Sequence, residues 1–68
     1  MLDIYLKSGS SITVNNFTEV SFYSSGNLVT VTKDTIDRFF ISPSITYKFK
    51  GTNTIVLNGD EIRFLELS

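Results

Sequence analysis

Few residues of this chain could perform acid–base or nucleophilic chemistry. The 68 residues include no histidine and no cysteine, so a general base or nucleophile would have to be Asp, Glu, Lys, Ser or Tyr. The closest carboxylate pairs are Asp60 with Glu61 and Asp34 with Asp37. Neighbours on a strand point to opposite faces, so the first pair cannot converge there, and the second pair fits the cap of a turn better. The sequence therefore predicts no enzyme activity and no catalytic residue.

Metal binding has equally little support. Without His and Cys, a metal would need oxygen ligands, and the segment Asn58-Gly59-Asp60-Glu61 lacks the Asp-x-Asp-x-Asp spacing of a calcium loop. We therefore interpret this segment as a turn. The sequence predicts no metal site and no bound cofactor.

The segment Tyr47-Lys48-Phe49-Lys50 carries the residue types that hold single-stranded nucleic acid, in which rings stack on bases and lysines neutralise phosphates. Alternation along a strand, however, places Tyr47 and Phe49 on one face and Lys48 and Lys50 on the other. The formal net charge of −1 also provides no overall attraction to nucleic acid. Nucleic-acid binding by a small Sm-like or OB-like barrel is therefore the alternative function and not the favoured one.

The elements that would position any site are strands. The apolar residues are mainly Ile, Val, Leu and Phe, the alternate positions are often Ser or Thr, and the chain has no alanine, which is strand composition. A chain of this length allows one domain, residues 1–68. We expect an all-β fold: a small antiparallel β-meander of five to seven short strands, curled into a partly open barrel of SH3, Sm or OB size.

Turn residues define the expected hairpins. Ser25-Gly26 predicts a tight turn with the pairs Phe22–Val29, Val20–Val31, Ser21–Thr30 and Tyr23–Leu28. A three-residue loop at Ser8-Gly9-Ser10 predicts the pairs Leu6–Ile12 and Ile4–Val14. A bulge or bend is expected at Asn16–Thr18. Residues 33–38 form either one helical turn or a turn between two strands.

The last third of the chain has the strongest hairpin signal, since two alternating apolar runs meet at Asn58-Gly59-Asp60. The turn is either Asn58-Gly59 or Gly59-Asp60, and we favour the second because it aligns apolar pairs across the strands. Either register requires a positive φ at Gly59. Both registers place one set of residues on a shared face: Ile55, Leu57, Ile62 and Phe64.

More apolar residues are present than one core face needs, and a surplus that includes aromatic residues predicts an interface. The interface candidates are Tyr5, Tyr23, Leu28, Phe40, Val56, Leu65 and Leu67. Alternatively, the ends of a barrel or its bulges would take up these side chains. The run Phe39-Phe40-Ile41 is predicted to be a strand that ends at Pro43. Because its apolar residues are continuous and do not alternate, one ring must leave the core face.

The alternation changes phase between Phe64 and Leu65. Strict alternation sends Leu65 and Leu67 outward, whereas a bulge at Phe64–Leu65 would return both to the core. A second copy of the chain would cover outward leucines, and C2 symmetry is the commonest arrangement for such a pair.

These observations favour a non-enzymatic protein-interaction module that self-associates. No basic and apolar signal region and no apolar run of membrane-spanning length is present, so a soluble, cytoplasmic protein is expected. In its length and its richness in Ser, Thr and Asn, the chain resembles the small accessory proteins of bacteriophages and prophages of low-GC bacteria. That resemblance implies a protein that binds and modulates another protein, but it assigns a role to no particular residue.

Overall fold

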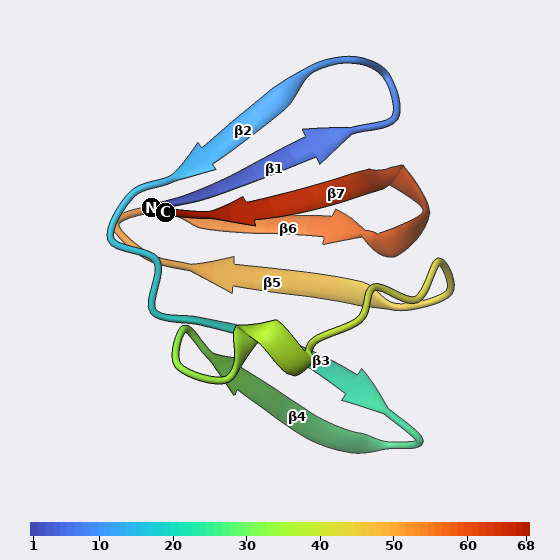
Figure 1. Ribbon diagram of the computed structural model, residues 1–68. Coiled ribbons are helices and arrows are strands. Elements are labelled where there is room, and N and C mark those ends of the chain that lie inside the picture. The colour runs from blue at the N-terminus through green and yellow to red at the C-terminus, as the bar shows by residue number, and fades with distance from the viewer.

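The computed structural model describes all residues, 1–68, and shows an all-β fold with seven strands. The strands are β1 (Leu2–Leu6), β2 (Ser11–Val14), β3 (Glu19–Ser24), β4 (Asn27–Thr32), β5 (Thr46–Lys50), β6 (Thr54–Asn58) and β7 (Ile62–Leu67) (Figure 1). Two 3₁₀ turns join them, η1 (Ile36–Arg38) and η2 (Gly59–Glu61). No helix in the chain has the length and apolar character that crossing a membrane requires.

The strands form two antiparallel sheets, one of three strands in the order β2-β1-β7 and one of four in the order β4-β3-β5-β6. The all-β prediction is confirmed, and the strand number lies within the predicted range. No strand pairing joins the two sheets, so they do not close into a barrel. The first and last residues meet, because the Ser68 N–H donates to the Met1 carbonyl at 2.9 Å (Figure 1).

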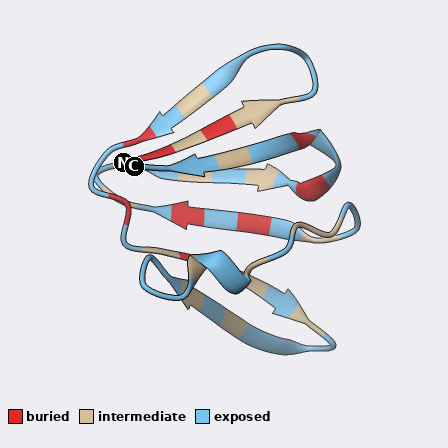
Figure 2. Cartoon of the chain, viewed as in Figure 1, coloured by how far each residue is buried: buried red, intermediate tan, exposed pale blue.

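One hydrophobic core draws residues from both sheets. Its buried members are Leu2, Ile4, Val14, Phe17, Val20, Tyr47, Phe49 and Ile62. Buried and exposed positions alternate along β5, as the period-two pattern predicts (Figure 2). Tyr47 is at the centre of an aromatic cluster, with ring centroids 5.0 Å from Phe22 and 5.3 Å from Phe39. The side chains that alternate with these core residues form the outward faces of the two sheets.

The hairpin of β3 and β4 forms as predicted. All four expected pairs are present, including Val20 with Val31 and Tyr23 with Leu28. Ser25 and Gly26 both have positive φ, 52° and 82°, which is the left-handed pair that a two-residue hairpin turn needs. The bend expected at Asn16–Thr18 is also present: Asn16 has φ of 53° and separates strands of different sheets.

The register predicted for β1 and β2 is wrong by two residues. Ile4 pairs with Ile12 and Leu2 with Val14. The loop starts one residue earlier than predicted, because the Leu6 N–H donates to the Ser10 carbonyl at 2.8 Å and Gly9 supplies the positive φ. A two-residue shift keeps every side chain on its face, so the core assignment survives.

The predicted hairpin of β6 and β7 does not form. β6 pairs with β5, β7 pairs with β1, and η2 connects the two sheets. Gly59 is not among the residues with positive φ. Its N–H donates to the Ile45 carbonyl at 2.7 Å, so this segment satisfies its backbone through β5 and the loop before it. β6 instead forms a hairpin with β5 through residues 51–53, and only β7 has a partner distant in the sequence, β1.

The change of phase in β7 occurs at Arg63, one residue before the predicted place. A register shift puts Phe64 opposite Tyr5 and Ile62 opposite Leu6, so Arg63 is the extra residue of a bulge. Phe64 therefore faces outward, and its predicted place on the core face is wrong. Leu65 and Leu67 face inward, which corrects the outward orientation predicted from strict alternation.

The connection from β4 to β5 contains the single helical turn that was one of two alternatives for residues 33–38, in 3₁₀ form. The strand predicted around Phe39-Phe40-Ile41 is absent. Phe39 and Ile41 pack against the core, whereas Phe40 is 85% exposed. The prediction that one ring leaves the core is thus confirmed.

Candidate functional site

The outward side of the four-stranded sheet carries three of the predicted interface residues together. Tyr23, Leu28 and Val56 are 69%, 59% and 55% exposed. The register explains the grouping: Tyr23 lies opposite Leu28 on β4, and Val56 on β6 lies opposite Lys48 on β5. We call this surface the basic face and define it by Tyr23, Leu28, Lys48, Lys50 and Val56.

The basic face is hollowed at its centre. Tyr23, Leu28, Lys48, Lys50 and Val56 line a shallow depression together with residues that include Ser21. Ser21 is opposite Lys48 and is only 8% exposed, so the small residue forms the floor and its larger neighbours form the walls. A partner could reach apolar side chains, an aromatic ring and two ammonium groups on one surface.

The division of the segment 47–50 between two faces is confirmed. Tyr47 and Phe49 are 1% and 0% exposed in the core, whereas Lys48 and Lys50 are exposed on the outward face. The Tyr47 hydroxyl is also occupied, because it accepts the Ser42 backbone N–H at 2.7 Å. The two core rings therefore cannot stack on bases, but Tyr23 on β3 provides an exposed ring on the same face as both lysines.

The outward side of the three-stranded sheet carries a second surface, which we call the acidic face and define by Asp3, Tyr5, Phe64 and Glu66. The rings of Tyr5 and Phe64 stack with centroids 4.4 Å apart and planes at 17°. Asp3 and Glu66 are opposite each other in the register of β1 and β7. Two aromatic rings and two carboxylates thus form adjacent rows of one sheet.

A hydrogen bond and a charge interaction link the aromatic row of the acidic face to its carboxylate row. The Tyr5 hydroxyl donates to Glu66 Oε1 at 3.4 Å, and Thr13 Oγ1 donates to Asp3 Oδ1 at 2.6 Å. The negative charge of Glu66 is the main reason that the pKa of Tyr5 is raised above its usual value, with smaller contributions from burial and from Asp3. The guanidinium of Arg63 lies over the Phe64 ring, 5.8 Å from its centroid.

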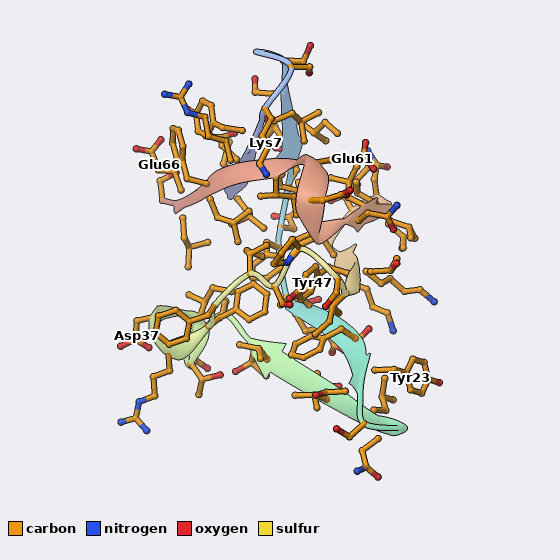
Figure 3. All side chains as sticks on the ribbon, turned by 90° about the vertical axis from the view of Figure 1, so that its right-hand side faces the viewer. Lys7, Tyr23, Asp37, Tyr47, Glu61 and Glu66 are labelled. Atoms are coloured by element: carbon orange, nitrogen blue, oxygen red, sulfur yellow. The ribbon has the colours of Figure 1, made fainter.

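The two faces point in opposite directions. They are the outward sides of two sheets that share one core, and Figure 3 shows Glu66 and Tyr23 projecting from opposite sides of the molecule. Neither face can therefore reach the other within one chain.

The remaining interface candidates are separate from both faces. Leu65 packs against the core, and Leu67, 41% exposed, borders an apolar hollow between the three-stranded sheet and the segment from η1 to β5. That hollow is lined by Leu2, Ile36, Phe39, Ile41, Leu65 and Leu67. Phe40 projects from the segment between η1 and β5 and belongs to neither sheet.

Phe64 is the site residue that sequence reasoning missed. It is 47% exposed and half of the stack with Tyr5. The only signal in the sequence was the break in alternation between Phe64 and Leu65, which could have been explained equally well by a bulge one residue earlier. Placing the bulge required the pairing partner β1.

The two carboxylate pairs considered for acid–base chemistry lie in local structures other than those predicted. Asp60 and Glu61 lie on η2 and not on a strand, so the argument from strand alternation does not apply to them. Asp34 and Asp37 flank the start of η1, whose N-cap is Thr35 without a side-chain capping bond, so the predicted cap is not formed. No three residues among the Asp and Glu side chains gather closely enough to hold a metal ion.

Comparisons with family models, with curated proteins and with solved structures find no significant match to this chain. The two outward sheet faces are therefore the features of the molecule that indicate a function.

Proposed function

We propose that this protein is a non-enzymatic protein-interaction module that self-associates through its outward sheet faces. The observation that carries the proposal is the gathering of Tyr23, Leu28 and Val56, each more than half exposed, on one face of the four-stranded sheet. Single exposed apolar residues are common on protein surfaces, but a cluster that contains an aromatic ring is typical of an interface.

The size of the face limits the area that association can bury. Four strands about 4.8 Å apart and about six residues long give a surface of roughly 20 Å by 20 Å. That is about half of the roughly 800 Å² per partner that standard interfaces bury. We therefore expect a weak contact, with a dissociation constant of the order of 10–100 μM.

The test is the mass in solution, measured by light scattering and sedimentation equilibrium up to about 1 mM protein, a range that covers weak contacts. We expect the mass to rise above that of one chain, 7.6 kDa. The double variant Tyr23→Thr with Leu28→Thr should remain monomeric, since threonine preserves strand propensity while removing the apolar surface.

Phe40→Thr is the matched control, because it removes an exposed aromatic residue outside both sheets. Its mass should equal that of the wild type. A wild-type protein that is monomeric over the whole range would overturn the proposal of self-association. Loss of association in Phe40→Thr alone would move the interface to the η1–β5 segment.

The second candidate function is binding of single-stranded nucleic acid on the basic face. The observation that favours it is that Tyr23 shares this face with Lys48 and Lys50. Only two lysines contribute and the chain has a net charge of −1, so we expect no complex tighter than about 10 μM near physiological salt. A tighter complex that weakens steeply with salt and is lost in Lys48→Glu/Lys50→Glu would reverse this ranking.

A further inference from the structure

We infer that the contact between copies is heterologous: the basic face of one molecule binds the acidic face of the next. This inference rests on the proposed self-association and names the surface that covers the basic face. A second copy is the occupant because the chain itself carries the complementary surface, with two carboxylates beside two stacked rings.

The two faces match row by row. On the acidic face, the Tyr5–Phe64 row is followed by the Asp3–Glu66 row, two residues along each strand. On the basic face, the Tyr23–Leu28 row is followed by the row that contains Lys48 and Val56, also two residues along the strands. Strands repeat at about 3.3 Å per residue in both sheets, so an apolar row can meet an apolar row while carboxylates meet an ammonium group.

Each face also carries one charge of the other sign, and neither contradicts this pairing. The Arg63 guanidinium lies over the Phe64 ring, and along β7 Arg63 precedes Phe64 whereas Glu66 follows it. Glu19 is opposite Lys50 on the basic face, one row beyond Lys48. The carboxylate row and the Lys48 row therefore remain the strongest opposite charges available.

Packing of either face against its own copy is less favourable. Two basic faces related by a twofold axis through the hollow would bring Lys48, which lines the hollow, close to its symmetry mate. Two acidic faces in contact would bring the Asp3 and Glu66 carboxylates of both copies together. Like charges in contact disfavour a partner strongly. Because the complementary faces point to opposite sides of the molecule, repeating the contact builds a ring or an open chain of molecules.

The experiment reverses one charge on each face. Glu66→Lys and Lys48→Glu each alter an exposed side chain, and each should weaken self-association about tenfold or more. An equal mixture of the two variants should recover association, because Lys48→Glu retains a native acidic face and Glu66→Lys retains a native basic face. Sedimentation equilibrium measures all three samples.

Controls with the same change in net charge are Glu61→Lys on η2 and Lys33→Glu after β4, both exposed and outside the two faces. Both should associate like the wild type. Thermal unfolding verifies that each variant is folded; if a reversal destabilises the chain, Glu66→Gln and Lys48→Gln replace it, with a smaller loss expected.

The outcomes separate this inference from the proposed function. A wild-type protein that stays monomeric overturns both. A twofold dimer that responds to Lys48→Glu but not to Glu66→Lys, or a mixture that gains nothing over the separate variants, overturns the heterologous contact and leaves self-association standing.

Discussion

Two glycine-containing turns look alike in the sequence and differ in the structure. Ser25-Gly26 joins β3 to β4, which pair directly, and both residues have positive φ. Asn58-Gly59-Asp60 joins β6 to β7, which belong to different sheets, and none of its residues has positive φ. The first turn obeys local turn chemistry, whereas the second is determined by what surrounds it.

Gly59 is required for a different reason from Gly26. A Cβ at Gly26 would meet nothing within 4 Å, whereas a Cβ at Gly59 would collide with the Ser42 carbonyl oxygen and lie 3.0 Å from Tyr47 Cε2. Glycine therefore permits a backbone conformation at one turn and a close approach of two chain segments at the other. A sequence pattern that contains glycine does not distinguish these roles.

The largest expected effect follows from that difference. Gly59→Ala should lower the free energy of unfolding by about 3 kcal/mol, the upper end of the usual cost of overpacking, because a backbone carbonyl must move. Gly59→Asn should cost at least as much. Asparagine tolerates a positive φ, but that gives no advantage at a position where φ is not positive, and its side chain is larger than that of alanine. Chemical unfolding at equilibrium measures both.

Gly26 provides the matched control. Gly26→Ala should cost about 1 kcal/mol for its positive φ, and Gly26→Asn less than that. If asparagine is tolerated at position 59 better than alanine, a positive-φ turn is present there after all, and the packing explanation is wrong.

A smaller effect is expected for Tyr47→Phe. The Tyr47 hydroxyl accepts the Ser42 N–H at 2.7 Å in a partly buried position, and Ser42 is the residue that crowds Gly59. Removing the hydroxyl leaves that N–H unpaired and should cost about 1–2 kcal/mol. Because Ser42, Tyr47 and Gly59 are in contact, combining Tyr47→Phe with Gly59→Ala should give a non-additive change in the unfolding free energy.

Tyr23→Phe is the control for this variant, since Tyr23 is 69% exposed on the β3–β4 hairpin. It should leave the unfolding free energy nearly unchanged. Additive costs for Tyr47→Phe and Gly59→Ala would show that the loop before β5 does not depend on Tyr47.

The smallest expected effect is on the pKa of Tyr5 and on stability at high pH. It depends on β7, which pairs with β1 and not with β6. The bulged register brings Glu66 to the Tyr5 hydroxyl, which raises the Tyr5 pKa. A pKa raised in the folded state means that folding favours the protonated phenol. Its contribution to stability is therefore full below the unfolded value of about 10 and is lost as pH rises through the folded pKa.

Titration of the Tyr5 ring resonances by NMR measures this shift. Glu66→Gln should lower the Tyr5 pKa, because Glu66 is its largest cause, and Tyr5→Phe should remove part of the stability loss above about pH 10. Glu61→Lys, on η2, should leave the Tyr5 pKa unchanged. If the pKa of Tyr5 is the same in Glu66→Gln as in the wild type, the result would contradict the register of β1 and β7.

Much of the basic face followed from the sequence, and only part of the acidic face did. The pair Tyr23–Leu28 and the outward Lys48 and Lys50 were predicted from one turn and from alternation. Tyr5 was predicted as an interface residue, but Phe64 was assigned to the core and its stack with Tyr5 was not foreseen. Tyr5 and Phe64 are 59 positions apart in the sequence (64 − 5), so no local pattern indicates their contact.

The amino-acid sequence by itself determined the all-β class, the inward or outward side of most strand residues and the β3–β4 register. These properties depend on a period of two and on backbone preferences within a few residues. Only the tertiary structure decided that β7 pairs with β1 and not with β6, and that Gly59 lies under Ser42. Hydrogen bonds from β7 to the distant strand β1 satisfy the same backbone groups that a hairpin with β6 would use, and burial of a shared core selects between them.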